Sequence, residues 1–254
     1  MTSQSELWLG GPIASGVRCV LAPNPSAWTL EGTNTWVIGM PDSTHVVIDP
    51  GPAHAGHLSQ VAAAIDGDVS AIILTHAHID HSEGAPALSE QLNVPVMEKH
   101  DVDGLSLGDI ELRMHHTPGH SSDSICITVA TPEGKYLLSG DTVLGRGTTL
   151  VAHPDGRLDQ YFDSLRYLRD HCEAEGIDLL LPGHGPVSRT PVGLIDFYEQ
   201  HRRNRLEQVR ASMASGLITP EQIAADVYRD VDPSVLPAAE LTVAAQLEYL
   251  KENI

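Results

Sequence analysis

Basic residues are scarce in this chain of 254 residues: 15 lysines and arginines stand against 34 aspartates and glutamates, a net charge of −19. So acidic a balance argues against a protein dedicated to duplex nucleic acid, whose contact surface is usually basic. We therefore expect no duplex DNA among its partners, although a local basic patch is not excluded by the net charge.

Cysteine is also rare, and long apolar runs are lacking. Cys19, Cys126 and Cys172 are odd in number and far apart, which does not suit a disulfide framework. No apolar run approaches the roughly 18 residues that a membrane-spanning helix needs. The start, MTSQSELWLGG, has neither a basic nor an apolar signal segment. We expect a cytoplasmic protein that does not bind membranes.

Strands and helices alternate up to about residue 190. Helical spacing predicts helices at 57–65, 83–92 and 158–176. Apolar or β-branched runs that end in Gly, Pro or polar residues predict strands at 33–39, 44–51, 69–76, 94–98, 110–116, 124–130, 135–141 and 177–185. The pattern is that of an α/β domain.

The pattern changes to helices alone at Pro191. We expect helices at 191–216, at 219–228 with Thr219 as N-cap and Pro220 in the first turn, and at 232–254 with a break near Pro237. This change predicts a catalytic domain over residues 1–190 and a helical C-terminal domain over residues 191–254.

Residues of the kinds that bind metals follow directly on four of the apolar runs. In layered α/β folds, strand ends are where sites are assembled. The candidate ligands are His76, His78, Asp80, His81, His120, Asp141 and His184. The other nine of the 14 histidines do not cluster in this way, and we expect them at the surface or behind the ligands. His116 is the strongest exception, because it lies close to His120.

The spacing of these ligands suits two metal ions. Within the loop His76–His81, the first two histidines alternate and can share one metal, which His120 would complete. The aspartate and the last histidine of the loop face a second metal, which His184 would complete, and the Asp141 carboxylate can bridge both. Two metals about 3.5–4 Å apart clamp the attacking and leaving oxygens of a displacement and generate hydroxide near neutral pH. We expect two Zn²⁺ ions, or Mn²⁺ or Fe²⁺ in their place, with Asp80 and Asp141 as the catalytic carboxylates.

The motifs THAHIDH, PGH, GD and PGHG, in this order, resemble the metallo-β-lactamase superfamily over residues 30–190. The resemblance implies a four-layer αβ/βα sandwich with the site at one edge of both sheets. It implies the same division of ligands between two zinc ions, and a metal-bridging hydroxide as nucleophile. It also makes Asp49, in VVIDPG, the carboxylate that orients a ligand imidazole from behind.

Further motifs, GTNTW, SGDTVLGRGTT, LPGHGP and YEQHRRNRLEQV, resemble the lactamase-like protein two family. Members of that family carry a small helical C-terminal domain similar to a winged helix. Its animal members are single-strand endoribonucleases, and its bacterial members are mostly assigned only as hydrolases. The glyoxalase II family shares the THxHxDH loop, but its glutathione-binding basic residues have no clear equivalent in this tail.

Two segments are candidates for binding substrate: the loop that holds Arg146, Thr148 and Thr149, and the GTNT motif with Asn34 and Thr35. Arg146 is suited to a phosphate or carboxylate, and a solvated arginine is the alternative. For the GTNT motif, a role in a turn is equally plausible.

HRRNR, at 201–205, is the one basic cluster. Residues 191–254 carry net −4, against net −15 for residues 1–190. The cluster would attract RNA phosphates or pair with Glu199 and Glu207, and we favour the pairing. No aromatic ladder that would stack single-strand bases accompanies it.

These observations favour a hydrolase of a small-molecule ester, thioester or lactone. The alternatives are a metal-dependent single-strand endoribonuclease and a glyoxalase II-like hydroxyacylglutathione hydrolase. A non-catalytic metal-binding scaffold is the least favoured, because the ligand set is intact. The partner is thus a small molecule or single-stranded RNA, and the oligomeric state, with a dimer among the options, is open.

Overall fold

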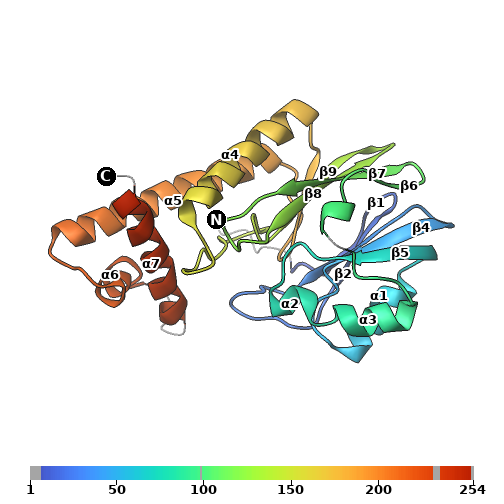
Figure 1. The fold of residues 1–254 in the computed structure, drawn as a ribbon, viewed down its shortest axis with the longest axis horizontal. Coiled ribbons are helices and arrows are strands. Elements are labelled where there is room, and N and C mark those ends of the chain that lie inside the picture. Colours follow the sequence, from blue (N-terminus) through green and yellow to red (C-terminus); the bar gives the residue numbers. More distant parts are fainter. Residues whose placement is uncertain (1–6, 98, 231–234, 253–254) are drawn as a thin grey trace.

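The computed structural model describes residues 7–97, 99–230 and 235–252 of the chain. Two mixed five-stranded sheets face each other, and helices cover the outer face of each sheet (Figure 1). This four-layer arrangement confirms the predicted αβ/βα sandwich.

The first sheet has the order β1-β2-β3-β4-β5, and the second has the order β10-β9-β8-β7-β6. In each sheet one pair is parallel, β4 with β5 and β9 with β10, and the other pairs are antiparallel. The strands are β1 (Gly11–Ala14), β2 (Val17–Leu21), β3 (Asn34–Ile38), β4 (Ser43–Ile48), β5 (Gly67–Ile73), β6 (Leu105–Leu107), β7 (Ile110–His116), β8 (Ile125–Thr131), β9 (Gly134–Gly140) and β10 (Leu179–Pro182).

The helices are short in the first half of the chain and long in the second. They are α1 (Ala55–Ala63), α2 (Ile79–Ser82), α3 (Ala85–Leu92), η1 (Lys99–Asp101), α4 (Leu158–Glu175), α5 (Pro191–Ala214), α6 (Pro220–Val227) and α7 (Leu236–Glu252). Thr219 caps α6 as predicted, since its side chain accepts a hydrogen bond from the backbone N–H of Gln222.

Three apolar clusters fill the spaces between the layers. Strand β4 contributes to two of them: Val46 and Ile48 enter the cluster between the sheets, and Val47 enters the cluster under α1 and α3. Successive strand side chains point to opposite faces, so a strand covered on both faces needs a continuous apolar run. Burying each such side chain contributes about 1.5–3 kcal/mol.

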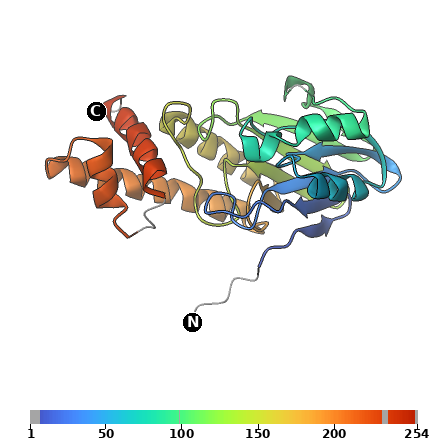
Figure 2. The ribbon, with the colours of Figure 1, turned by 90° about the horizontal axis from the view of Figure 1, so that it is seen from below.

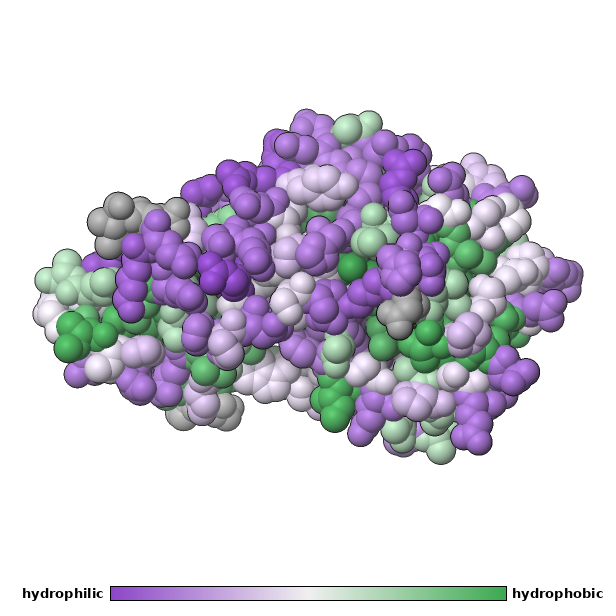
Figure 3. Space-filling model, viewed as in Figure 1, coloured by the Kyte–Doolittle hydropathy of each residue, from purple (hydrophilic) through white to green (hydrophobic). Residues whose placement is uncertain are grey.

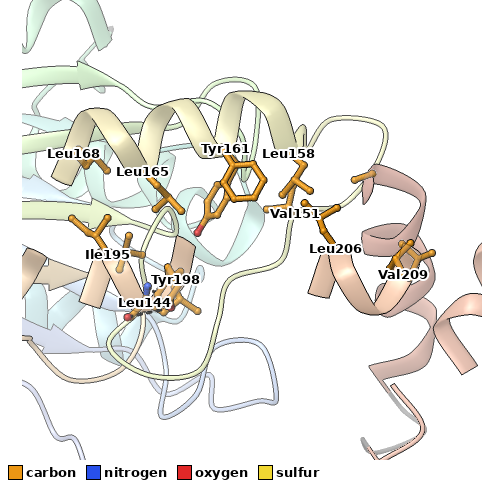
Figure 4. Close-up of a cluster of buried hydrophobic side chains, with 14 of the residues drawn as sticks. Leu144, Val151, Leu158, Tyr161, Leu165, Leu168, Ile195, Tyr198, Leu206 and Val209 are labelled. Atoms are coloured by element: carbon orange, nitrogen blue, oxygen red, sulfur yellow. Dashed lines mark hydrogen bonds between the residues drawn. The ribbon is translucent and has the colours of Figure 1, made fainter. Parts of the chain in front are cut away.

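The third cluster joins the second sheet to the helices α4, α5, α6 and α7. Tyr161 of α4 and Tyr198 of α5 are fully buried within it (Figure 4), and it continues through Leu206 and Val209 to Val243 of α7. The C-terminal helices gather at one end of the molecule (Figure 2). The division at residue 190 stays a prediction, because the same core crosses it.

Two expected elements differ from the structure. The segment 94–98 forms only a single bridge, Ile72 to Val96, so the strand predicted there is absent among the residues described. Pro237 does not break a helix, because α7 begins at Leu236 and places the proline in its first turn, where no backbone N–H is needed.

The outer surface agrees with the composition. The face shown in Figure 3 is mostly hydrophilic, with apolar residues in scattered groups. In the part of the chain that is described, no helix has both the length and the apolar character needed to cross a bilayer.

Candidate metal centre

The ends of four strands bring all seven predicted ligands together. The loop His76–His81 follows β5, His120 follows β7, Asp141 follows β9 and His184 follows β10. Their ligand atoms form overlapping groups in which all atoms lie within 4.8 Å of one another. His116, in contrast, is exposed and contacts the carbonyl oxygen of Ser122.

The first group consists of three histidines. Nε2 of His76 lies 3.1 Å from Nδ1 of His78, and Nε2 of His120 lies 3.0 Å from that same atom. His76 and His120 are buried and His78 is exposed, so the group opens to solvent on one side only.

The second group consists of Asp80, His81 and His184. His81 Nε2 and His184 Nε2 lie 3.2 Å apart, and Asp80 Oδ2 lies 3.2 Å from His184 Nε2. Asp141 stands between the groups, because its oxygens lie 3.3 Å from His81 Nε2, 3.4 Å from His184 Nε2 and 3.9 Å from His120 Nε2.

A glycine allows this close approach. A Cβ atom added at Gly183 would lie 2.4 Å from Asp141 Oδ1 and 2.8 Å from a ring carbon of His81. The PGHG motif therefore has a steric reason for glycine immediately before His184.

The charges of the site oppose the cost of burial. Burial alone would raise the pKa of Asp141, but His184 and His81 hold it well below the usual value. Burial alone would lower the pKa of His184, but Asp141 and Asp80 raise it to about 9. The carboxylates therefore stay ionised and attract positive charge to this edge of the sheets.

The ring nitrogens that point away from the centre are held by protein groups. Nδ1 of His120 contacts the Leu150 carbonyl oxygen at 2.7 Å, and Nδ1 of His184 contacts the Gly32 carbonyl oxygen at 3.2 Å. Partners of this kind fix the tautomer and the ring orientation that metal binding requires.

Asp49 supports His81 in the same way. Its Oδ2 lies 2.9 Å from Nδ1 of His81, and both side chains are buried. The same carboxylate accepts hydrogen bonds from the backbone N–H and the hydroxyl of Thr75, at 2.8 and 2.7 Å. Asp49 thus links the end of β4 to the start of the histidine loop, the place that the sequence predicts for it.

The donor set fits divalent cations. His81 Nε2 and His184 Nε2 lie 3.2 Å apart, while Nδ1 of each ring faces an oxygen atom, of Asp49 and of Gly32. In the neutral rings Nδ1 is therefore the donor and both Nε2 atoms are acceptors, which a cation between them would satisfy. Asp141 Oδ1 is buried and accepts no hydrogen bond from any described residue, although His81 Nε2 is near. Nitrogen and carboxylate oxygen are the ligands that zinc prefers where thiolates are absent.

A cavity of about 430 Å³ opens from the ligands toward the C-terminal helices. Arg146, Thr148 and Thr149 line it, as does His201, one of the nine histidines that we expected at the surface or behind the ligands. Its motif HRRNR gave no sign of this position, which depends on the tertiary packing of α5.

Asn34 and Thr35, expected as substrate contacts, do not line this cavity. Asn34 is fully buried and donates to the carbonyl oxygens of Pro182 and Gly185 at 2.9 and 2.8 Å, so it holds the loop of His184. Thr35 donates to the Asp49 carbonyl oxygen at 2.7 Å. Both side chains are satisfied by the protein and brace the site.

The arginines of HRRNR have three different surroundings. Arg203 is exposed and pairs with Glu199 at 2.5 Å, the pairing that we favoured. Arg202, at 3% exposure, is buried and donates to the Thr149 carbonyl oxygen. Arg205 is half-buried beside Tyr228. Arg202 and Arg205 line the cavity and Arg203 does not, so the three arginines do not share one surface.

A four-layer αβ/βα sandwich with histidines and aspartates gathered at one sheet edge defines a class of metal-dependent hydrolases. The chain belongs to the metallo-beta-lactamase superfamily, whose family model matches residues 28–103 and 98–184. A second model, the beta-lactamase associated winged helix domain, matches residues 219–253 and confirms the predicted winged-helix-like C-terminal domain.

Curated relatives cover most of the chain. A beta-lactamase-like protein 2 homolog of Drosophila melanogaster is 30% identical over 95% of this chain and 89% of its own length. An atrochrysone carboxyl ACP thioesterase of Aspergillus chevalieri is 30% identical over 85% of this chain and 74% of its own length. The predicted likeness to the lactamase-like protein two family and the predicted hydrolase class are confirmed.

Solved structures share the fold. A beta-lactamase domain protein from Burkholderia ambifaria superposes with a TM-score of 0.80 at 23% identity, over 96% of this chain and 88% of that one. A metallo-beta-lactamase family protein from Thermus thermophilus gives 0.73 at 20% identity, over 94% of each chain.

Proposed function

We propose that the protein is a binuclear zinc-dependent hydrolase that cleaves a thioester or ester of a small molecule. The observation that carries this proposal is the cavity of about 430 Å³, which has the metal-binding donors on one side and helices α5 and α7 on the other. Sites for small molecules are typically about 300–1,000 Å³ and largely apolar.

The walls of the cavity suit an acyl group. Trp28 and Leu30 line it from the loop before β3, and Val235 and Ala239 line it from the side of α7. A single-stranded RNA would instead need an open basic groove with aromatic platforms. The relative named as a carboxyl ACP thioesterase supports a thioester in particular.

In this proposal His76, His78 and His120 would hold one zinc ion, Asp80, His81 and His184 would hold the second, and the Asp141 carboxylate would serve both. When bound, the two ions supply Lewis acidity and a water that ionises near neutral pH.

Asp80 is the carboxylate placed to move a proton. It lines the cavity and its side chain is 29% exposed. Burial would raise its pKa, but the hydrogen bond with His184 and the charge of His81 lower it, so the carboxylate is ionised at neutral pH. It can accept a proton from water and pass it toward the leaving atom.

A thiol leaving group fits this arrangement. Thiols ionise near pH 8.5, roughly the value of cysteine, so a thiolate leaves with little help from an acid. Among the described residues that line the cavity, no carboxylate other than Asp80 and Asp141 is present to protonate an alkoxide.

A substrate panel tests the proposal. The zinc-loaded protein is assayed with S-hexanoylpantetheine, p-nitrophenyl hexanoate, S-lactoylglutathione, nitrocefin and an unstructured RNA, each beside a metal-free control. We expect zinc-dependent cleavage of the hexanoyl thioester above all others. Cleavage of RNA alone would replace this proposal with the endoribonuclease, and preference for S-lactoylglutathione would favour the glyoxalase II alternative.

A further inference from the structure

The side of α5 that faces the cavity carries positive charge. His201, Arg202 and Arg205 line the cavity from this helix, and positions i and i+4 share one face. Of the described residues that line it, only Asp80 and Asp141 are acidic, and both belong to the metal centre. In a chain of net charge −19 this is a local reversal of sign.

Two arginines on α5, Arg203 and Arg210, are neutralised by ion pairs, and Arg205 is not. Arg203 and Arg210 pair with Glu199 and Glu207, each at 2.5 Å. Arg205 contacts neutral groups: it donates to the side-chain oxygen of Gln208 at 2.7 Å and to the Val227 carbonyl oxygen at 3.2 Å. No ion pair of Arg205 occurs within residues 7–97, 99–230 and 235–252.

The position of the Arg205 guanidinium is fixed. It lies 4.6 Å from the ring centre of Tyr228, which also lines the cavity. A stacked, half-buried guanidinium loses little side-chain entropy when it binds an anion, and its planar fork matches carboxylate and phosphate oxygens.

The other two arginines of the cavity are less suitable. Arg146 pairs with Glu31 at 2.6 Å, and this glutamate is nearly buried, so the charge of Arg146 is already matched. Arg202 is buried, and its Nε has no hydrogen-bond partner in the part of the chain that the structure describes. Its donor bond to the Thr149 carbonyl oxygen already positions it, and its charge, which has no ion pair among the described residues, raises the potential of the cavity.

The pKa of His201 is affected by this positive potential. Burial and the charges of Arg202 and Arg205 lower its pKa to about 4. It is therefore neutral at pH 7 and adds a hydrogen-bonding group beside Arg205 without adding charge.

We propose that Arg205 binds an anionic group of the substrate, a carboxylate or a phosphate, at the wall of the cavity formed by α5 and Tyr228. This rests on the proposed function and narrows it: the substrate is an acyl thioester or ester with an apolar section between the scissile bond and a negative charge. The chain thereby selects against neutral esters of the same size.

The test uses three thioesters that differ only in charge and its place: S-hexanoylpantetheine, S-hexanoyl-4′-phosphopantetheine and S-adipoylpantetheine. Wild type is compared with Arg205→Gln, with Arg205→Lys, and with Arg203→Gln as the matched control on the same helix. We expect wild type to prefer one of the two charged substrates. Arg205→Gln should raise KM for that substrate about tenfold, the equivalent of about 1.4 kcal/mol, with kcat and the neutral substrate nearly unchanged.

Arg205→Lys should retain part of the preference, and Arg203→Gln all of it. The substrate that wild type prefers shows which anion Arg205 binds: a phosphate on the thiol side of the thioester or a carboxylate on the acyl side. Equal KM values for all three thioesters in wild type, or equal losses on charged and neutral substrates in Arg205→Gln, would overturn the inference and leave the proposed function standing. RNA cleavage that depends on Arg205, with thioesters indifferent to it, would overturn it as well.

Equilibrium binding separates this inference from the chemistry. Calorimetry compares the products pantetheine and 4′-phosphopantetheine, and hexanoate and adipate. One outcome is that no thioester is cleaved, yet 4′-phosphopantetheine binds more tightly than pantetheine, or adipate more tightly than hexanoate. If Arg205→Gln abolishes that difference in affinity, the proposed function fails and the anion site stands. If Arg205→Gln leaves every product affinity unchanged, the anion site fails.

Discussion

Arg202 donates a hydrogen bond to the backbone carbonyl oxygen of Thr149, and so helix α5 holds the loop that orients His120. The next carbonyl oxygen of that loop, of Leu150, contacts Nδ1 of His120 at 2.7 Å, and the Thr149 hydroxyl lies 3.2 Å from the same nitrogen. The buried guanidinium of Arg202 therefore connects helix α5 to His120 of the candidate metal centre.

Replacing Arg202 should weaken metal binding at the His76–His78–His120 group. Arg202→Met keeps much of the buried volume and removes the donor, so we expect the metal affinity to fall about 10–100-fold, as when other supporting partners of metal ligands are removed. Competition with a chromophoric chelator measures this. Arg203→Met, one position along the helix, is the control and should bind metal like wild type. If Arg202→Met also binds metal like wild type, the hydrogen bond from α5 to the loop does not contribute to metal affinity.

Asp49 should matter for the other group. The charges of Asp141 and Asp49 both raise the pKa of His81, and Asp49→Asn removes the second of them and weakens the hydrogen bond to His81 Nδ1. We expect about 10–100-fold weaker binding of one metal, with the other affinity nearly unchanged. Two-step titration with Co²⁺, followed by its visible absorption, resolves the sites, and equal weakening of both would show that Asp49 acts on the fold instead.

The carboxylate between the two groups should be indispensable. Asp141→Asn keeps the shape but removes the charge, so we expect loss of one metal and a fall in kcat of more than about 100-fold, beyond the usual effect of supporting residues. Circular dichroism should show the fold retained. Activity near that of wild type, on every substrate that wild type accepts, would refute the bridging role.

A histidine outside the metal centre predicts acid sensitivity. His115 is buried against His171 and hydrogen-bonded to the hydroxyls of Tyr167 and Thr128, and burial and His171 lower its pKa to about 4. The unfolded chain, with a histidine pKa of about 6.5, binds a proton first as pH falls. His115 therefore costs no stability above about pH 6.5, and stability is lost as pH falls from there toward 4.

Urea unfolding of wild type and His115→Gln at pH 7.5 and 5.0 checks this. The variant should lose less free energy of unfolding between the two pH values. Both proteins contain the same metal ligands, so subtracting one loss from the other removes the contribution of those ligands. Equal losses in both proteins would show that His115 carries no such linkage.

The seven candidate metal ligands could be found from the sequence because their signal is local. Each follows an apolar strand by a few residues, as His184 follows β10, and strands of one layered fold end at a common edge. The helix α4 and the cap at Thr219 were predictable for the same reason, since helical spacing and capping residues lie within one segment.

What depends on distant contacts could not be predicted. Arg202 and Arg203 are adjacent in one charge run, yet one is buried against residue 149 and the other pairs on the surface. Asn34 reaches Pro182 and Gly185, about 150 positions away, and so its role as a brace has no trace in the GTNT motif itself.

The most direct test of the binuclear centre is its metal content. The protein is stripped with a chelator, loaded with excess zinc, desalted and analysed for zinc and protein by elemental analysis. We expect two zinc ions per chain in wild type, because six terminal ligands and one carboxylate between them suit two sites with an open position each. A folded wild-type chain that retains no zinc, or never more than one ion, with all seven side chains intact, would contradict this account.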